Sequence, residues 1–241
     1  MIALAIGFAG SATALPALQL GPGSMGAWDY VPGDVVDEDT WVTGSNPFEL
    51  LALANATKGL GGDGDYSWDA AGAGTQTAYL VASAIPHIAF DGFNITLEND
   101  TNVLTMIASG TGTPPLGDTN SLAPHGVFAT YFEIYEFTFD FSDPLDLVDI
   151  YDTQPGGTGT GKGYIEAFKV TVNSLAAEVA GVHFDLFTLT GDGIYDPDIG
   201  GGIVNRFAPF SHDATFVPEP TGAVLFSIGL LVVGSAIRRS R

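Results

Sequence analysis

Two acidic, glycine-containing segments hold the side chains of this chain that are best suited to chemistry. The first is Asp63-Gly64-Asp65 with Asp69, and the second is Asp192-Gly193 with Asp196 and Asp198. Such loops can present several carboxylate oxygens to a hard cation, so calcium is the only cofactor that these residues predict. Neither spacing matches an EF-hand loop, and Asx-turns explain both segments equally well. The candidate metal ligands are Asp63, Asp65, Asp69, Asp192, Asp196 and Asp198.

Four histidines are the candidate bases at neutral pH: His87, His125, His183 and His212. None belongs to an H-E-x-x-H motif, and none lies beside a G-x-S-x-G turn. Ser211-His212-Asp213 places three triad residue types side by side. A catalytic triad is a spatial arrangement, however, and adjacent residues rarely point at one centre. We therefore interpret this segment as structural.

Paired carboxylates are the other source of catalysis to consider, because glycoside hydrolysis needs two acids flanking a groove. Glu133 and Glu136 are close in sequence, but their odd separation places them on opposite faces of a strand. No other pair stands out among the 28 acidic residues. We expect no enzymatic activity.

The charge and cysteine content exclude several functions. The chain has 7 basic and 28 acidic residues, with a formal net charge of -21. A surface this acidic repels phosphate backbones, so we expect no nucleic-acid partner. There is no cysteine, which excludes thiol nucleophiles, iron–sulfur sites and zinc fingers.

The elements that must position any site are predicted to be strands. Four runs are rich in β-branched, aliphatic and aromatic residues: Phe48 to Leu53, Gln76 to Ile85, Tyr131 to Phe141 and Tyr164 to Val172. The third run alternates apolar with polar residues, which is typical of a strand with one buried face. The chain has 32 glycines and 14 prolines, and glycine-rich turn segments separate the runs. We predict an all-β fold, a two-sheet antiparallel β-sandwich of jelly-roll type over residues 15–216.

Residues 1–14 are predicted to be a signal peptide. An apolar stretch is followed by small residues, and Ala12 and Ala14 occupy the -3 and -1 positions of a cleavage site. Cleavage is therefore expected after Ala14.

The C-terminal segment is predicted to be a single transmembrane helix. Residues Gly222 to Ile237 are apolar or small, and Arg238, Arg239 and Arg241 follow directly. A helix of this length reaches about 24 Å, and snorkelling arginines can extend it toward the roughly 30 Å of a hydrocarbon core. Positive residues stay on the cytoplasmic side, so the body of the chain would be exported.

Residues 217–241 resemble the PEP-CTERM sorting signal of bacteria that make extracellular polysaccharide. The likeness rests on Val217-Pro218-Glu219-Pro220, the apolar span and the three arginines, in that order. The prolines bias their neighbours toward an extended form that a protease cleft can bind. The resemblance implies that an exosortase recognises Pro218, Glu219 and Pro220 and removes the tail. An inner-membrane-anchored precursor would then become a cell-envelope, outer-surface or extracellular protein.

The body resembles the exported choice-of-anchor N proteins. The likeness rests on short segments spread over most of the body, among them Glu38 to Thr43, Asn46 to Leu50, Pro124 to Phe128, Thr130 to Phe132 and Ala208 to Ala214. The resemblance implies an envelope location and a β-sandwich, and it implies no catalytic activity.

These observations predict a non-enzymatic protein of the cell envelope or extracellular matrix with a structural or adhesive role. Its expected partners are the exosortase, the membrane before processing, and extracellular polysaccharide. The alternative is a carbohydrate-binding or polysaccharide-active protein in which Trp28, Trp41, Trp68 or exposed tyrosines stack against sugars. Trp41 lies in a strand-like run, which favours a place in the core.

Overall fold

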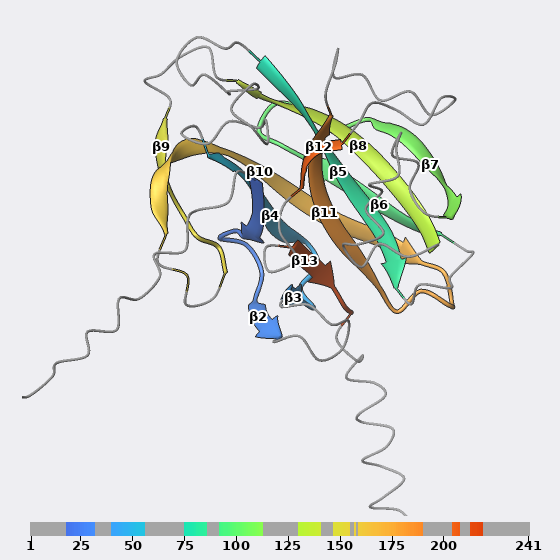
Figure 1. Ribbon diagram of the computed structural model, residues 1–241. Helices are drawn as coiled ribbons and strands as arrows, with labels where there is room; N and C mark the ends of the chain where they lie inside the picture. The colour runs from blue at the N-terminus through green and yellow to red at the C-terminus, as the bar shows by residue number, and fades with distance from the viewer. Residues whose placement is uncertain are drawn as a thin grey trace, which may run out of the picture.

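The described residues form an all-β structure, as predicted. The computed structural model describes residues 18–31, 40–55, 75–85, 92–112, 130–140, 147–154, 157, 159–189, 204–207 and 213–218. These residues contain thirteen strands, β1 to β13, and no helix (Figure 1). Within these ranges, no helix therefore meets the length and hydropathy that a membrane crossing requires. The predicted signal peptide, the apolar span 222–237 and the three terminal arginines lie outside the described residues.

One sheet has five strands, in the order β1-β4-β10-β6, and β9 also pairs with β10. Every pair in this sheet is antiparallel. Its longest strand, β10, bends across the molecule and pairs with β4, β6 and β9, while β1 pairs with β4 (Figure 1). The bounds are β1 Leu18–Pro22, β4 Phe48–Asn55, β6 Phe93–Glu98, β9 Val148–Tyr151 and β10 Thr160–Leu175.

The other sheet has eight strands, in the order β2-β3-β13-β11-β5-β8-β7, and β12 also pairs with β11. The bounds are β2 Trp28–Val31, β3 Thr40–Thr43, β5 Thr75–Ile85, β7 Met106–Gly112, β8 Thr130–Asp140, β11 Gly181–Leu189, β12 Val204–Phe207 and β13 Asp213–Phe216. The prediction of purely antiparallel sheets is wrong at one pair, because β3 and β13 run parallel. A parallel pair needs a long connection, and residues 44–212 lie between these two strands.

All four predicted strand segments are confirmed as β4, β5, β8 and β10. Their bounds differ from the prediction by at most a few residues. The largest difference is in β10, which begins at Thr160 because Thr160 to Gly163 pair with β9. The glycine-rich sequence before Tyr164 predicts turn material, but pairing with a neighbouring strand holds its last residues extended.

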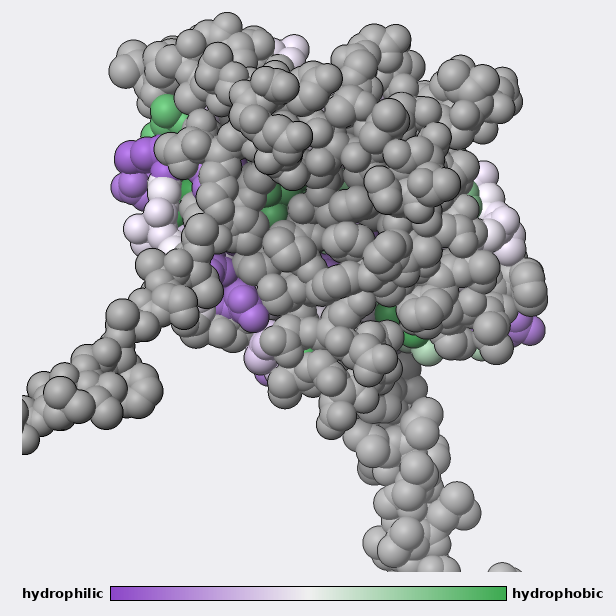
Figure 2. All heavy atoms as spheres, in the orientation of Figure 1, coloured by the Kyte–Doolittle hydropathy of each residue, from purple (hydrophilic) through white to green (hydrophobic). Residues whose placement is uncertain are grey.

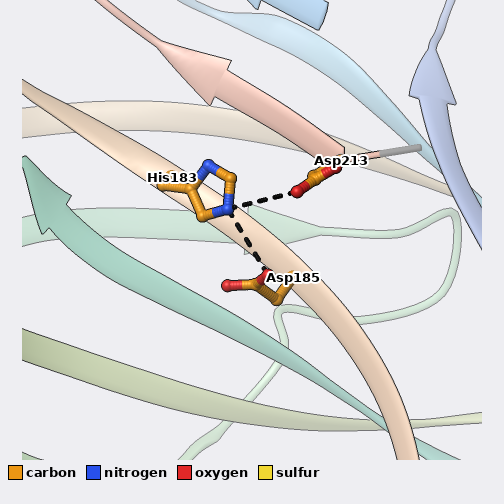
Figure 3. A group of neighbouring side chains, drawn as sticks. All are labelled: His183, Asp185 and Asp213. Atoms are coloured by element: carbon orange, nitrogen blue, oxygen red, sulfur yellow. Dashed lines mark ion pairs between the residues drawn. The ribbon is translucent and has the colours of Figure 1, made fainter. Parts of the chain in front are cut away.

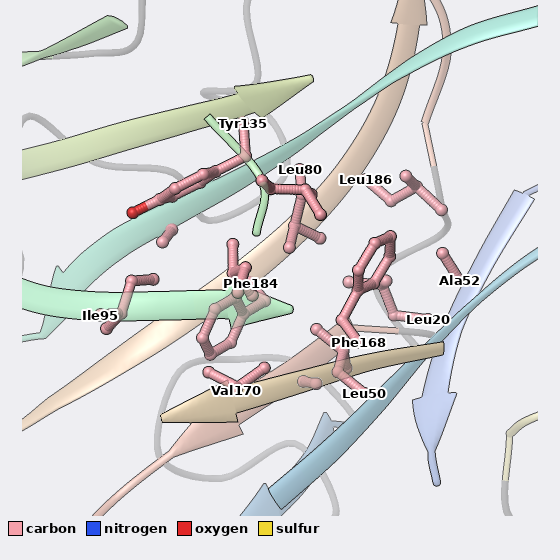
Figure 4. Packing of buried hydrophobic residues seen from close by; sticks show 14 of the residues in the cluster. Leu20, Leu50, Ala52, Leu80, Ile95, Tyr135, Phe168, Val170, Phe184 and Leu186 are labelled. Carbon is pink, nitrogen blue, oxygen red and sulfur yellow. The ribbon is translucent and has the colours of Figure 1, made fainter. Parts of the chain in front are cut away.

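The described residues form one hydrophobic core between the two sheets. Inward-facing side chains from both sheets form one cluster, which includes Leu20, Leu50 and Phe168 from the five-stranded sheet and Leu80 and Phe184 from the eight-stranded sheet (Figure 4). All five are fully buried or nearly so. Burial of such apolar area is the main favourable contribution to folding.

The face of each sheet that points away from this core also carries buried residues. In β5, Tyr79 and Val81 alternate with the core-facing alanines and leucine and join a second cluster with Phe132, Ile134 and Phe187. Leu53 and Ile150 form a third, smaller cluster on the five-stranded sheet. For the run Tyr131 to Phe141, the prediction of one buried face is therefore wrong in the first residues, where Phe132 and Ile134 are buried on the second face. Strands buried on both faces contain continuous apolar runs, as β5 does from Ala78 to Ala82.

The described surface is mixed in character. Figure 2 shows both hydrophilic and hydrophobic atoms where described residues reach the drawn face. The large exposed hydrophobic residues are scattered over different strands and connections, among them Met25, Val103, Val148 and Tyr151. Single exposed apolar residues of this kind are normal for a folded protein.

Candidate functional site

Within the part of the chain that the structure describes, the strongest concentration of chemically useful side chains lies on the outer face of the eight-stranded sheet. We call it the His183 cluster, and it consists of His183, Asp185, Asp213 and Thr215. His183 and Asp185 are two residues apart in β11, so the strand projects both from the same face. Asp213 and Thr215 stand in the same relation in the neighbouring strand β13, and Thr215 lies opposite His183.

The imidazole of His183 points its Nε2 atom between two carboxylates (Figure 3). Nε2 lies 3.4 Å from Asp185 Oδ1 and 3.5 Å from Asp213 Oδ2. On the other side of the ring, Nδ1 lies 2.9 Å from the Thr215 hydroxyl. The histidine is therefore held between a hydroxyl group and two acids.

All three ionisable side chains of this cluster are buried. Their exposed fractions are 8% for His183, 7% for Asp185 and 4% for Asp213. When the β11–β13 register is continued by one residue, Asp185 lies opposite Asp213. Like charges on facing strand positions repel, and burial strengthens the repulsion. The arrangement therefore favours a positive species between the carboxylates, either a protonated imidazole or a cation.

A second cluster lies on the core-facing side of β8 and consists of Tyr131, Glu133 and Tyr135. The Tyr131 hydroxyl donates to Glu133 Oε1 at 2.9 Å, and the Tyr135 hydroxyl donates to Oε2 at 2.5 Å. Burial raises the pKa of Glu133 above its ordinary 4.5, while the two tyrosine hydrogen bonds partly oppose the shift. Burial, together with Glu133, raises the pKa of Tyr131 to about 12 and also raises the pKa of Tyr135.

A polar hollow of roughly 520 Å³ lies on the five-stranded sheet beside the β6–β7 connection. Its lining includes Asn99, Asn102 and an ion pair of 2.8 Å between Lys169 and Glu98. Asn99 Oδ1 accepts hydrogen bonds from the backbone of Thr101 and Asn102, which holds the connection in a fixed turn.

Comparison with known protein families, with curated proteins and with solved structures finds no match for this chain. Its function must therefore be inferred from the residues themselves.

Most of the sites predicted from sequence lie outside the described residues. These are Ala12, Ala14, Asp63, Asp65, Asp69, Asp192, Asp196, Asp198, Glu219, Pro220, Arg238, Arg239 and Arg241, together with His87, His125, Ser211, His212 and Trp68. Asp213, the last residue of the Ser-His-Asp run, is in β13, where it faces His183 of β11.

The glutamate pair behaves as its spacing predicts. Glu133 is buried toward the core, whereas Glu136 is exposed on the opposite face. Sequence reasoning missed the importance of Glu133, although a signal was present. Glu133 is an even number of residues from Tyr135, Phe137 and Phe139, so all four side chains point to the same face of the strand. A carboxylate therefore lies on a face that is otherwise apolar.

The two described tryptophans are partly buried and held by contacts within the protein. Trp28 packs edge-on against Phe48, with ring centres 5.4 Å apart. Trp41 donates its indole N–H to the backbone oxygen of Thr153 at 2.7 Å. Thr153 in turn donates to the Gln19 side chain of β1, so Trp41 links β3 to the other sheet.

Substitution of Glu133 with glutamine is expected to change how stability depends on pH. A raised folded-state pKa means that the folded protein keeps the Glu133 proton to higher pH than the unfolded chain does. The contribution of Glu133 to stability is therefore fully present below its ordinary pKa of 4.5 and is lost as pH rises through the folded-state value. Because a glutamine side chain does not ionise, we expect the variant to gain stability over the wild type between pH 4 and pH 7.

Urea unfolding of both proteins at several pH values measures this difference. Glu136→Gln is the matched control, since Glu136 lies three residues away and is exposed. We expect the control to follow the wild-type pH profile. If the free energy of unfolding of Glu133→Gln, relative to the wild type, falls from pH 4 to pH 7, the prediction is wrong. The Glu133 carboxylate would then be better stabilised in the folded state than in water.

Proposed function

We propose that this chain is a non-enzymatic, exported protein of the cell envelope or extracellular matrix with a structural or adhesive role. Its C-terminal segment acts as a PEP-CTERM sorting signal that an exosortase processes. The body is a jelly-roll-type sandwich of the choice-of-anchor N kind. Before processing, the apolar span 222–237 holds the precursor in the inner membrane.

The observation that carries the proposal is the position where the sorting motif begins. The last described strand, β13, ends at Phe216, and the backbone N–H of Val217 still donates to Thr43 O at 2.9 Å. Val217 is 42% exposed and Pro218 is also exposed. The motif therefore begins at the surface, directly after the body, where a protease can reach it without unfolding a strand.

The body also has the properties that an exported structural domain needs. Its two sheets share one core, and the domain is stabilised without disulfide bonds because the chain has no cysteine. Several segments that carry the family resemblance overlap described strands, including Asn46 to Leu50, whose last three residues begin β4, and Thr130 to Phe132 at the start of β8.

Intact-mass spectrometry of the native protein from envelope and medium fractions tests the sorting proposal. We expect a mature mass that lacks residues 1–14 and the segment after about Pro220. The variant Glu219→Gln is expected to keep its tail and remain in the membrane fraction. Glu178→Gln, an exposed substitution in the body, is the matched control and is expected to be processed normally. A wild-type protein that retains Arg241 after normal growth would contradict the proposal.

Carbohydrate binding is the second candidate, and the polar hollow beside the β6–β7 connection supports it. Asn99, Asn102, Glu49 and Glu98 offer the amide and carboxylate groups that hydrogen-bond sugar hydroxyls. Neither Trp28 nor Trp41 lines this hollow, so among the described tryptophans stacking would not contribute there. Loss of glycan binding in Asn102→Ala, with binding retained in Trp41→Phe, would favour this candidate.

A further inference from the structure

We propose that His183, Asp185 and Asp213 bind a divalent transition-metal ion, and that zinc is its most suitable occupant. This inference does not depend on the sorting proposal. Its ligands are also different residues from those of the two acidic segments, Asp63 to Asp69 and Asp192 to Asp198, for which the sequence predicts calcium.

The spacing of the ligand atoms fits a zinc ion. Zinc lies about 2.0–2.1 Å from a histidine nitrogen and about 2.0–2.2 Å from a carboxylate oxygen, in tetrahedral geometry. Two ligand atoms of one tetrahedral zinc are therefore roughly 3.4 Å apart. The two Nε2–carboxylate distances are 3.4 Å and 3.5 Å, and one ligand atom from each of the three residues lies within 4.8 Å of the others. These distances are longer than an ordinary N–H···O hydrogen bond of about 2.7–3.2 Å.

One oxygen of Asp185 needs a partner. The Asp185 side chain is more than nine-tenths buried, and its Oδ1 faces His183 Nε2 (Figure 3). Its Oδ2 is buried with no hydrogen-bond donor in the described part of the chain. Leaving a buried carboxylate oxygen without a donor is costly, and coordination of a cation by both oxygens of Asp185 would remove that cost.

The charge of the cluster also favours a divalent cation. Two ionised aspartates and a neutral imidazole carry two negative charges, which one divalent cation neutralises. Without a cation between them, Asp185 and Asp213 repel each other from facing positions of adjacent strands. Because the cluster is buried, water screens the charges little, so a cation stabilises the two carboxylates more strongly here than it would at the surface.

The surroundings of His183 are those of a metal ligand. Metal-binding histidines usually donate their other ring N–H to a neighbouring acceptor, which fixes the ring orientation. Thr215 Oγ1 lies 2.9 Å from Nδ1 and provides that acceptor. With the proton on Nδ1, the lone pair of Nε2 faces the two carboxylates, where the ion is bound.

The ligand set selects a transition metal over calcium. Imidazole suits zinc and its neighbours, whereas calcium takes six to eight oxygen ligands at longer distances. One nitrogen and two carboxylates on closely packed strands match the smaller ion. The second oxygen of Asp185 or a water molecule completes the coordination.

The test is the zinc content and zinc affinity of the full chain, purified in detergent. We expect about one zinc per chain by elemental analysis, and chelator competition should show that Asp185→Asn binds zinc at least ~100-fold more weakly. Changing a residue that only supports a metal ligand typically lowers metal affinity 10–100-fold. The loss expected for Asp185→Asn is at least as large, because a ligand itself is changed. Thr215→Val is expected to weaken binding by about 10-fold or more.

Asp149→Asn is the matched control for non-specific binding by an acidic protein. The Asp149→Asn substitution removes one negative charge, as Asp185→Asn does. The Asp149 side chain, however, is 85% exposed and pairs with Lys162. We expect its zinc affinity to equal that of the wild type. Equal weakening in Asp149→Asn and Asp185→Asn, or a wild-type chain that retains no zinc, would overturn the proposal in favour of a protonated His183 paired with two aspartates.

X-ray absorption of the zinc-loaded wild type makes the test independent of variant folding. We expect one imidazole nitrogen at about 2.0–2.1 Å and oxygen ligands at about 2.0–2.2 Å. A spectrum with oxygen ligands alone, or displacement of the zinc by an equal concentration of calcium, would overturn the assignment.

Discussion

Replacing Gly163 with alanine is expected to lower the free energy of unfolding by about 3 kcal/mol or more, which is among the largest effects in this chain. Gly163 lies in β10, where Asn55 of β4 and Val148 of β9 are its register partners. A Cβ atom there would collide with the backbone oxygen of Ala54 and lie 2.6 Å from Ile150 Cδ1. A backbone atom inside a paired strand cannot rotate away, so the strands must separate.

Urea unfolding followed by tryptophan fluorescence measures this loss. Gly110→Ala is the matched control, because a Cβ in β7 meets only the ring of Phe132, at 3.3 Å. The ring can shift by a few tenths of an ångström, so we expect a change below about 1 kcal/mol. Similar stability of the two variants would mean that β4, β9 and β10 are not packed as described.

Replacing Phe48 with alanine is expected to cost about 3–5 kcal/mol. Phe48 is fully buried in β4 of the five-stranded sheet. Its ring stacks against Phe216 with centres 5.7 Å apart and meets Phe184 edge-on at 5.9 Å, both in the eight-stranded sheet. Removing the ring leaves a cavity between the sheets and loses these aromatic contacts. Since domains of this kind are stable by only about 5–15 kcal/mol, the variant loses a large share of its stability.

Two further variants make the Phe48 result specific. Phe48→Leu keeps much of the volume, so its cost should be roughly half as large. Tyr151→Ala removes an aromatic side chain that is 45% exposed, and we expect a change within about 0.5 kcal/mol. The expected order of stability is Tyr151→Ala, then Phe48→Leu, then Phe48→Ala. A Phe48→Ala variant as stable as Tyr151→Ala would show that the sheets do not meet at this ring.

The sequence alone determined the class of fold and the strands, because alternation and β-branched composition are local properties. The runs that became β4, β5, β8 and β10 are examples. The opposite orientations of Glu133 and Glu136 also followed from the sequence, since side chains alternate along any strand. The proposed signal peptide and sorting signal likewise rest on sequence, because most of their residues lie outside the described structure.

The tertiary structure decided which strands are neighbours. The parallel pairing of β3 with β13 joins segments from opposite ends of the body, and no local pattern encodes such a partner. Burial of both faces of β5 likewise depends on what packs against each face.

The His183 cluster shows both contributions in one site. The pattern His183-x-Asp185 was visible in the sequence, and strand geometry alone places both side chains on one face. Asp213 and Thr215 reach His183 only because β13 pairs with β11 in a particular register. A local pattern can therefore place two ligands, but long-range strand pairing brings the third ligand and its supporting hydroxyl into position.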